Sequence, residues 1–222
     1  MAKTSFGKGA QSAITVVGHW ALAPVLQSFK NMLTPRRFQK DFRFFHLNSG
    51  LNDLSWAHTP MRERWSLFCE ALFEIQRRTD LTAHAFVLMG NHFHLLLSTR
   101  TAKEHILVEE FHQILNRLCN KTHDSLELPL FCEPIPSVEY YRNAYKYIYR
   151  NPLEAGLCLR VQEYEYSSLK GLLGRQPEEV PVIDNMGLIH SPQKILDWLN
   201  HDSAELQPKF RSEAPIDKMS YR

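Results

Sequence analysis

Two histidines in the middle of the chain have the spacing of paired metal ligands. His92 and His94 flank Phe93 within residues 89–97, a run that is otherwise mostly apolar and typical of a β-strand. Alternate side chains of a strand point to opposite faces, so both imidazoles are predicted to project from one face. Two imidazoles on a rigid element make half of a metal site. The same pair is also found as a packing feature of strands, so its partners must be sought elsewhere.

A helix predicted over residues 138–151 carries groups that could complete the site. Tyr147 lies one turn from Asn151, because residues three or four apart share a helix face. A phenol oxygen can attack a phosphodiester when it is close and aligned, and a cation held by two imidazoles and an amide oxygen can polarise the phosphate. Asn151 could supply that amide oxygen. Tyrosine-rich helices are also common packing elements, and Tyr145 and Tyr149 are rival nucleophiles.

The same helix carries three basic residues at intervals of four. Arg142, Lys146 and Arg150 are predicted to form a basic ridge along one side of it. Such a ridge could steer a phosphate backbone, which makes these residues candidates for DNA binding. The alternative is an ordinary solvated helix face.

The composition is typical of a globular protein and does not by itself indicate nucleic-acid binding. The 222 residues are 44% hydrophobic and 23% charged, with a net charge of only +2, so any basic surface must be local. The four cysteines form no CxxC pair, which argues against a zinc ribbon or disulfide framework and suits a reducing cytoplasm. Residues 13–23 are apolar, but Gly18 and His19 interrupt them, which disfavours a signal peptide, and the run is too short for a membrane span.

The elements that must position these residues show either the two-residue repeat of a strand or the 3.6-residue repeat of a helix. Apolar patterns predict strands over 42–47, 82–89 and 92–98, helices over 61–78, 103–120 and 138–151, and a weak edge strand within 126–136. Gly90-Asn91 makes the turn of a hairpin, and Pro152 is expected to stop the third helix before a turn at Gly156. This order predicts an α+β fold, a ferredoxin-like antiparallel sheet with its helices packed on one face.

The chain is predicted to have three parts. Residues 1–40 form a basic N-terminal extension, which is either an arm touching nucleic acid or a solvated tail. Residues 41–174 form the catalytic domain. Residues 175–222 form a C-terminal extension with one short helix, opened by Ser191-Pro192.

Three sequence blocks together resemble a known family. Residues 85–97, residues 147–157 and Tyr166-Ser167-Ser168 occur in the order and at the spacing of the HUH single-tyrosine transposases, the insertion-sequence-200-like family. They are most similar to its REP-associated tyrosine transposase branch. The resemblance covers about residues 42–174. Gly90 stands where that family usually has proline, and Tyr149 stands where a histidine is frequent.

The resemblance implies roles for the residues that match. It implies a fold of HUH-endonuclease type, with Mg²⁺ or Mn²⁺ bound by His92, His94 and Asn151. Tyr147 would form a 5′-phosphotyrosine link to cleaved single-stranded DNA and leave a 3′-hydroxyl. The protein would be a DNA transposase that nicks and rejoins strands, with single-stranded or hairpin DNA as its partner, and the family allows a homodimer. Two alternatives remain: a non-catalytic DNA- or RNA-binding protein of the same fold, and a phosphodiesterase that activates water.

Overall fold

The computed structural model of the chain describes residues 35, 38, 41–50, 59–119, 130–175, 177 and 179–201. All of them belong to one compact unit that begins at Leu33. The predictions for the N-terminal extension fall almost wholly outside these residues, as does the apolar run at 13–23. Within the described part of the chain, no helix combines the length and apolarity needed to cross a membrane.

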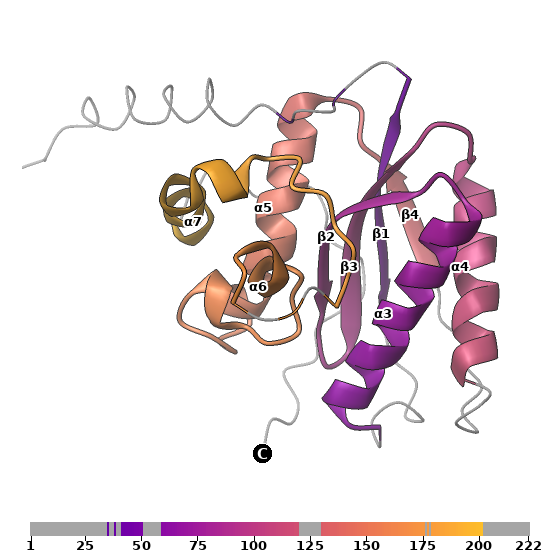
Figure 1. Cartoon of the computed structure of the whole chain (residues 1–222), viewed down its shortest axis with the longest axis horizontal. Coiled ribbons are helices and arrows are strands. Elements are labelled where there is room, and N and C mark those ends of the chain that lie inside the picture. Colours follow the sequence, from indigo (N-terminus) through magenta and orange to yellow (C-terminus); the bar gives the residue numbers. More distant parts are fainter. Residues whose placement is uncertain are drawn as a thin grey trace, which may run out of the picture. The chain divides into compact units, whose positions relative to one another are not determined.

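A four-stranded antiparallel sheet carries the candidate residues (Figure 1). Its strands lie side by side in the order β2-β3-β1-β4, and every neighbouring pair is antiparallel. The strands are β1 (Arg43–Gly50), β2 (Thr82–Leu88), β3 (His92–Thr99) and β4 (Leu130–Pro134). With helices between β1 and β2 and between β3 and β4, this is the ferredoxin-like arrangement, and the predicted α+β class is confirmed.

Helices cover both faces of this sheet, which differs from the predicted one-sided packing. Phe93 contacts Phe68 of α3 (Met61–Arg78) and Phe111 of α4 (Glu104–Cys119). The neighbouring His94 points the other way, toward Tyr147 of α5 (Val138–Glu154). After their first residue, β2 and β3 are buried without interruption, because both of their faces are covered. Such continuous burial is typical of strands between two layers of helices.

The helix α5 runs past the proline that was expected to stop it. Pro152 lies inside its last turn, and the helix ends at Glu154. Gly156 then adopts a left-handed conformation with φ of 73°, and Leu157 N donates to Pro152 O, which together form a Schellman end. Asn151 is therefore held within the helix, at a fixed rotation relative to Tyr147.

Residues after α5 pack back onto the domain. They form short helices: η2 (Val161–Glu163), α6 (Leu169–Leu172), η3 (Leu188–His190) and α7 (Pro192–Asn200). Two stretches cover the outer edge of β2, since Leu88 N donates to Tyr166 O and Ile183 N donates to Ala83 O. A covered edge cannot pair with another chain. The predicted helix after Ser191 is α7, and it lies beside α5 (Figure 1).

Candidate functional site

The register of the central strands places the two predicted histidines beside a third. Asn48 of β1 lies directly opposite His94, and His46 lies opposite Leu96. Directly opposed residues of antiparallel strands share a face, so His46, Asn48, His92 and His94 all project toward α5. The rings of His46 and His94 stack with centroids 5.1 Å apart, and those of His92 and His94 are 5.0 Å apart.

His92 is held between two asparagines. Its Nδ1 lies 2.7 Å from Asn91 Oδ1, and its Nε2 lies 3.1 Å from Asn151 Oδ1. Burial lowers the pKa of His92, while the hydrogen bond to Asn151 raises it, and the net direction is down. The neutral ring is thereby favoured, and it has one N–H and one lone pair.

His94 is wholly inside the domain and is held by His46. His94 Nδ1 lies 3.0 Å from His46 Nε2, and both residues are buried. Burial lowers the pKa of His94 well below its ordinary value, and the charges of His46 and His92 lower it further. Burial also lowers the pKa of His46 to about 4. At neutral pH the three rings are therefore uncharged and can act as ligands or hydrogen-bond partners.

Tyr147 lies against these rings. Its ring centroid is 5.2 Å from that of His94, with the two planes at 72°, and 6.2 Å from that of His46. Burial raises the pKa of the Tyr147 phenol, its hydrogen bond with Asn151 lowers it, and the charges of Glu154 and Glu133 raise it. The phenol is therefore protonated at neutral pH and needs help to become a nucleophile.

The two rival tyrosines face the opposite side of α5. Tyr145 and Tyr149 are fully buried, and their rings meet edge to face with centroids 4.9 Å apart. The Tyr149 hydroxyl is bonded to Ser168 Oγ at 2.9 Å, and burial raises its pKa. Both residues are core side chains, which leaves Tyr147 as the tyrosine of this trio that is near the histidines.

The donor set fits a divalent cation. If Nδ1–H of His92 donates to Asn91, the Nε2 lone pair faces the Asn151 oxygen at 3.1 Å. Two lone pairs at that distance repel unless the amide turns its NH₂ group to the ring or a cation joins them. Two ligands about 2.1 Å from an octahedral ion lie about 3.0 Å apart, close to the observed separation. No cluster of three His, Cys, Asp or Glu residues able to hold a metal occurs among the described residues, so a cation held by His92 and His94 would need the Asn151 amide as a further ligand.

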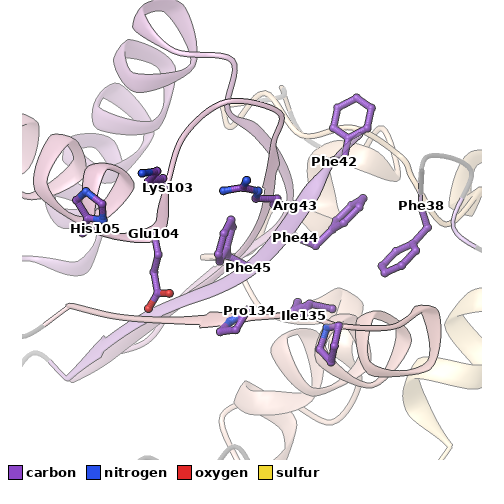
Figure 2. Close-up of a pocket in the computed structure, with 11 residues that line it drawn as sticks. Phe38, Phe42, Arg43, Phe44, Phe45, Lys103, Glu104, His105, Pro134 and Ile135 are labelled. Atoms are coloured by element: carbon purple, nitrogen blue, oxygen red, sulfur yellow. The ribbon is translucent and has the colours of Figure 1, made fainter. Parts of the chain in front are cut away.

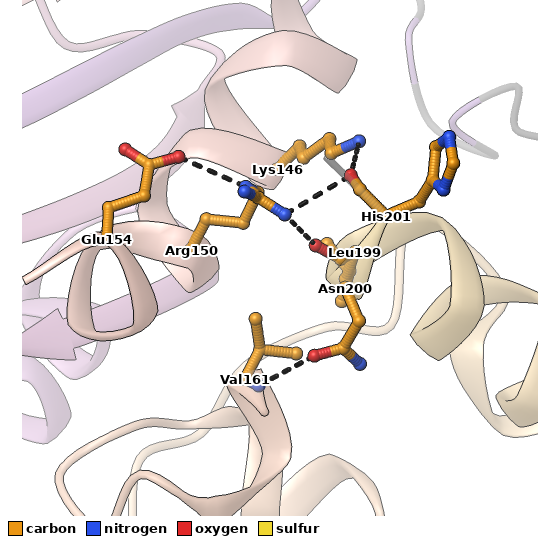
Figure 3. Close-up of polar contacts among 7 residues, drawn as sticks. All are labelled: Lys146, Arg150, Glu154, Val161, Leu199, Asn200 and His201. Atoms are coloured by element: carbon orange, nitrogen blue, oxygen red, sulfur yellow. Dashed lines mark hydrogen bonds and ion pairs between the residues drawn. The ribbon is translucent and has the colours of Figure 1, made fainter. Parts of the chain in front are cut away.

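The predicted basic ridge does not fit the structure. Lys146 and Arg150 are buried, with 4% and 6% of their surfaces exposed. Figure 3 shows both side chains turned toward the end of α7, where Lys146 Nζ donates to His201 O at 2.8 Å and Arg150 Nη1 donates to Leu199 O at 3.1 Å. Arg142 is half-buried. Two of the three predicted DNA-binding residues thus close the C-terminus of another helix, where cations are favourable.

One hollow in the described part of the chain lies away from the candidate residues. It is a cavity of about 630 Å³ at the other end of β1, and Figure 2 shows Phe42, Arg43, Phe44 and Lys103 around it. Phe44 lines this cavity and precedes His46 by two residues along β1, but none of the predicted site residues lines it. The candidate chemistry is therefore on the sheet face beneath α5 rather than in this cavity.

His46 and Asn91 are the neighbours that sequence reasoning missed. Asn91 was assigned to the turn before His92, and its side chain proves to contact that histidine. His46 belonged to a predicted strand, but its role depends on β1 pairing with β3, which no local pattern specifies. A histidine at an inward position of a neighbouring strand is the signal that could have found it.

The fold and the site together define a ferredoxin-like domain with a paired-histidine and tyrosine site on one sheet face. Comparison of sequences gives no further information, since no known family model matches the chain and no curated protein matches it. Among solved structures, one of a REP-associated tyrosine transposase bound to a REP hairpin is similar, with a TM-score of 0.49 and 19% identity, over 67% of this chain and 90% of that one. At this TM-score the likeness adds no weight to the site, which stands on its own geometry.

Proposed function

We propose that this protein is a DNA transposase that cleaves and rejoins single-stranded DNA through Tyr147, with a divalent metal. The observation that carries the proposal is the meeting of four groups from two elements. His92 Nε2 and Asn151 Oδ1 are 3.1 Å apart, and the rings of His94 and Tyr147 pack edge to face beside them. A purely structural helix does not require a nucleophile, two neutral imidazoles and an amide oxygen in one place.

The reaction is an exchange of phosphate esters. Tyr147 Oη forms a bond to the phosphorus, the bond from phosphorus to the 3′-oxygen breaks, and that oxygen takes up a proton to become a 3′-hydroxyl. The phenolic proton passes to solvent or to a neighbouring base, and the products are a 5′-phosphotyrosine and a free 3′ end. A 3′-hydroxyl can reverse the step, which rejoins strands without another energy source.

A bound Mg²⁺ or Mn²⁺ would polarise a non-bridging phosphate oxygen and orient the leaving group. In this proposal His92, His94 and Asn151 hold it. The protein's own contribution is a rigid, partly buried setting in which Tyr147 is aligned with the ligands before DNA arrives.

Since Lys146 and Arg150 of the predicted ridge are buried, we propose that the DNA strand lies over the open half of the same sheet face. Phe131 of β4 lies opposite Asn48, which lies opposite His94, so the three form one row across the sheet. Phe131 is 54% exposed, whereas Asn48 beside it is buried. An exposed aromatic ring suits an unpaired base, which can stack on it. Hairpin DNA as the preferred partner rests on the resemblance of the sequence blocks.

The decisive experiment detects the covalent intermediate. Purified protein, Mn²⁺ and end-labelled single-stranded DNA carrying a hairpin should give a protein–DNA adduct that survives denaturing electrophoresis. Tyr147→Phe should abolish it. Tyr140→Phe, two turns earlier on the same helix, is the matched control and should keep it. If Tyr147→Phe still cleaves at the wild-type rate, the tyrosine mechanism is wrong and activated water is favoured.

The remaining alternative has its own outcome in this assay. A protein that binds the hairpin tightly in Mn²⁺, yet forms neither adduct nor cleaved strand with any flanking sequence tried, is a binding module of the same fold. The substrates must include single-stranded flanks on both sides of the hairpin, because the position of cleavage relative to it is unknown.

A further inference from the structure

His46 has a place in the site that its burial alone does not explain. Its Nε2 lies 3.0 Å from Nδ1 of His94, in a part of the sheet where the two rings also stack. Only 1% of its surface is exposed. A histidine buried this deeply inside an apolar strand needs a polar partner, and its partner is a proposed metal ligand.

The two nitrogens of His94 have different tasks. A neutral imidazole has one N–H and one lone pair. With Nδ1 directed at His46, Nε2 is the nitrogen that remains for a metal, and a ligand nitrogen must carry the lone pair. The hydrogen must therefore be on Nδ1, which donates to Nε2 of His46, and His46 in turn must carry its own hydrogen on Nδ1.

We propose that His46 is a positioning residue that fixes the tautomer and orientation of His94 for metal binding. Outer partners of this kind are usual for metal-bound histidines, and they set both the tautomer and the basicity of the ligand. The proposal rests on the proposed function only through the metal site, not through DNA cleavage.

The other histidine of the pair has the equivalent arrangement. His92 Nδ1 lies 2.7 Å from Asn91 Oδ1, so each proposed ligand has its Nδ1 engaged by an outer acceptor. Both Nε2 atoms are thereby left for the same ion. His46 belongs to β1 and Asn91 to the hairpin turn, so two different segments orient the two histidine ligands of β3.

The chain offers a close control for a merely structural role. His84 of β2 is also fully buried, and its Nε2 is bonded to Ser98 Oγ at 2.8 Å. It lies in the same sheet but contacts none of the proposed ligands through a described bond. Replacing either histidine by phenylalanine keeps a buried ring and removes the hydrogen bond described for it.

The test is the affinity for Mn²⁺ alone, measured by electron paramagnetic resonance of the free ion and by calorimetry. His46→Phe should weaken binding by about 10- to 100-fold. His84→Phe should change it by no more than about twofold. His46→Gln, whose amide oxygen can reach the place of Nε2, should recover part of the loss. A His46→Phe variant with wild-type affinity overturns the proposal, as does an equal loss in His84→Phe.

A second measurement decides the matter on the wild-type protein, even if His46→Phe folds poorly. Nitrogen chemical shifts of the imidazoles in the metal-free protein distinguish the two tautomers. His94 should carry its hydrogen on Nδ1 and should show a coupling or exchange contact to His46. The Nε2–H tautomer of His94 would refute the assignment. Wild-type protein that binds Mn²⁺ but never forms a DNA adduct would refute the transposase function and leave the role of His46 intact.

Discussion

The buried cations of α5 give a prediction that separates two interpretations of the same residues. Arg150 Nη1 donates to Leu199 O at 3.1 Å and to His201 O at 3.2 Å, and its Nε is 3.1 Å from the exposed carboxylate of Glu154. Arg150→Met keeps most of the aliphatic stem and removes the donors. The change should destabilise the fold rather than weaken DNA binding directly.

The expected loss of stability depends on which hydrogen-bond donors each of the two carbonyl groups keeps after the substitution. His201 O still accepts from Lys146 Nζ at 2.8 Å, whereas Leu199 O loses this donor inside the protein. A buried acceptor left without its donor costs about 1–3 kcal/mol. The ion pair with Glu154 adds little, because that carboxylate is exposed. We expect Arg150→Met to lower the free energy of unfolding by about 1–3 kcal/mol.

A double mutant tests the shared acceptor. Lys146→Met alone should cost less than Arg150→Met, because Arg150 still donates to His201 O. In the double mutant His201 O loses both donors, so the combined loss should exceed the sum of the single losses by about 0.5 kcal/mol or more.

Urea unfolding followed by circular dichroism measures all of these variants, and Arg142→Met serves as the control with an expected change of about 0.5 kcal/mol or less. DNA affinity is measured in parallel over a range of salt concentrations. If Arg150→Met keeps full stability but reduces the slope of log affinity against log salt by about 1, Arg150 contacts a phosphate and the ridge interpretation was right.

Three further predictions concern other parts of the domain. In the metal-free protein, the pKa of His46 is about 4 when folded and about 6.5 when unfolded, so the unfolded state binds more protons between these values. The contribution of His46 to stability is therefore full above about pH 6.5 and is reduced by about 3 kcal/mol as the pH drops to 4. The lowered pKa values of His92 and His94 add to the loss in the same direction. Urea midpoints should show that His46→Phe weakens the pH dependence, and a His46→Phe variant with the wild-type pH dependence would contradict this. Phe131→Ala should weaken binding of single-stranded DNA by about 1–3 kcal/mol in fluorescence anisotropy without changing Mn²⁺ affinity, and an unchanged DNA affinity would remove Phe131 from the DNA path. Gly156→Ala should cost about 1–2 kcal/mol in thermal unfolding, since Gly156 has a φ of 73° and no neighbouring atom would touch the new methyl group; a neutral result would mean that the helix end can rearrange.

Local sequence patterns were sufficient to find each of the main strands and helices, although β1 continues to Gly50 and α5 continues to Glu154, beyond their predicted ends. His92 and His94 share a face because a strand alternates, and Tyr147 and Asn151 share a face because a helix repeats every 3.6 residues. That the two pairs meet was inferred from the family resemblance, and the structure brings them together through β3 and α5.

Contacts between different helices and strands could not be predicted from these local patterns. Lys146 and Arg150 have the spacing of a solvated ridge, and nothing in their own helix shows that α7 returns to cover them. The contact between His46 and His94 could be predicted only from the register of β1 against β3. The position of α5 on the far side of the sheet from α3 was missed, although the uninterrupted apolar runs of β2 and β3 were a sign of it.

The contact between α5 and α7 also limits how far the chain can be shortened. The family resemblance ends near residue 174, and a fragment cut there would seem to keep every proposed catalytic group. It would also strip the carbonyl partners from two buried cations on the helix that bears Tyr147. The smallest fragment that should fold with an aligned Tyr147 therefore extends through His201, so the unit proposed to act on DNA is longer than the segment that carries its motifs.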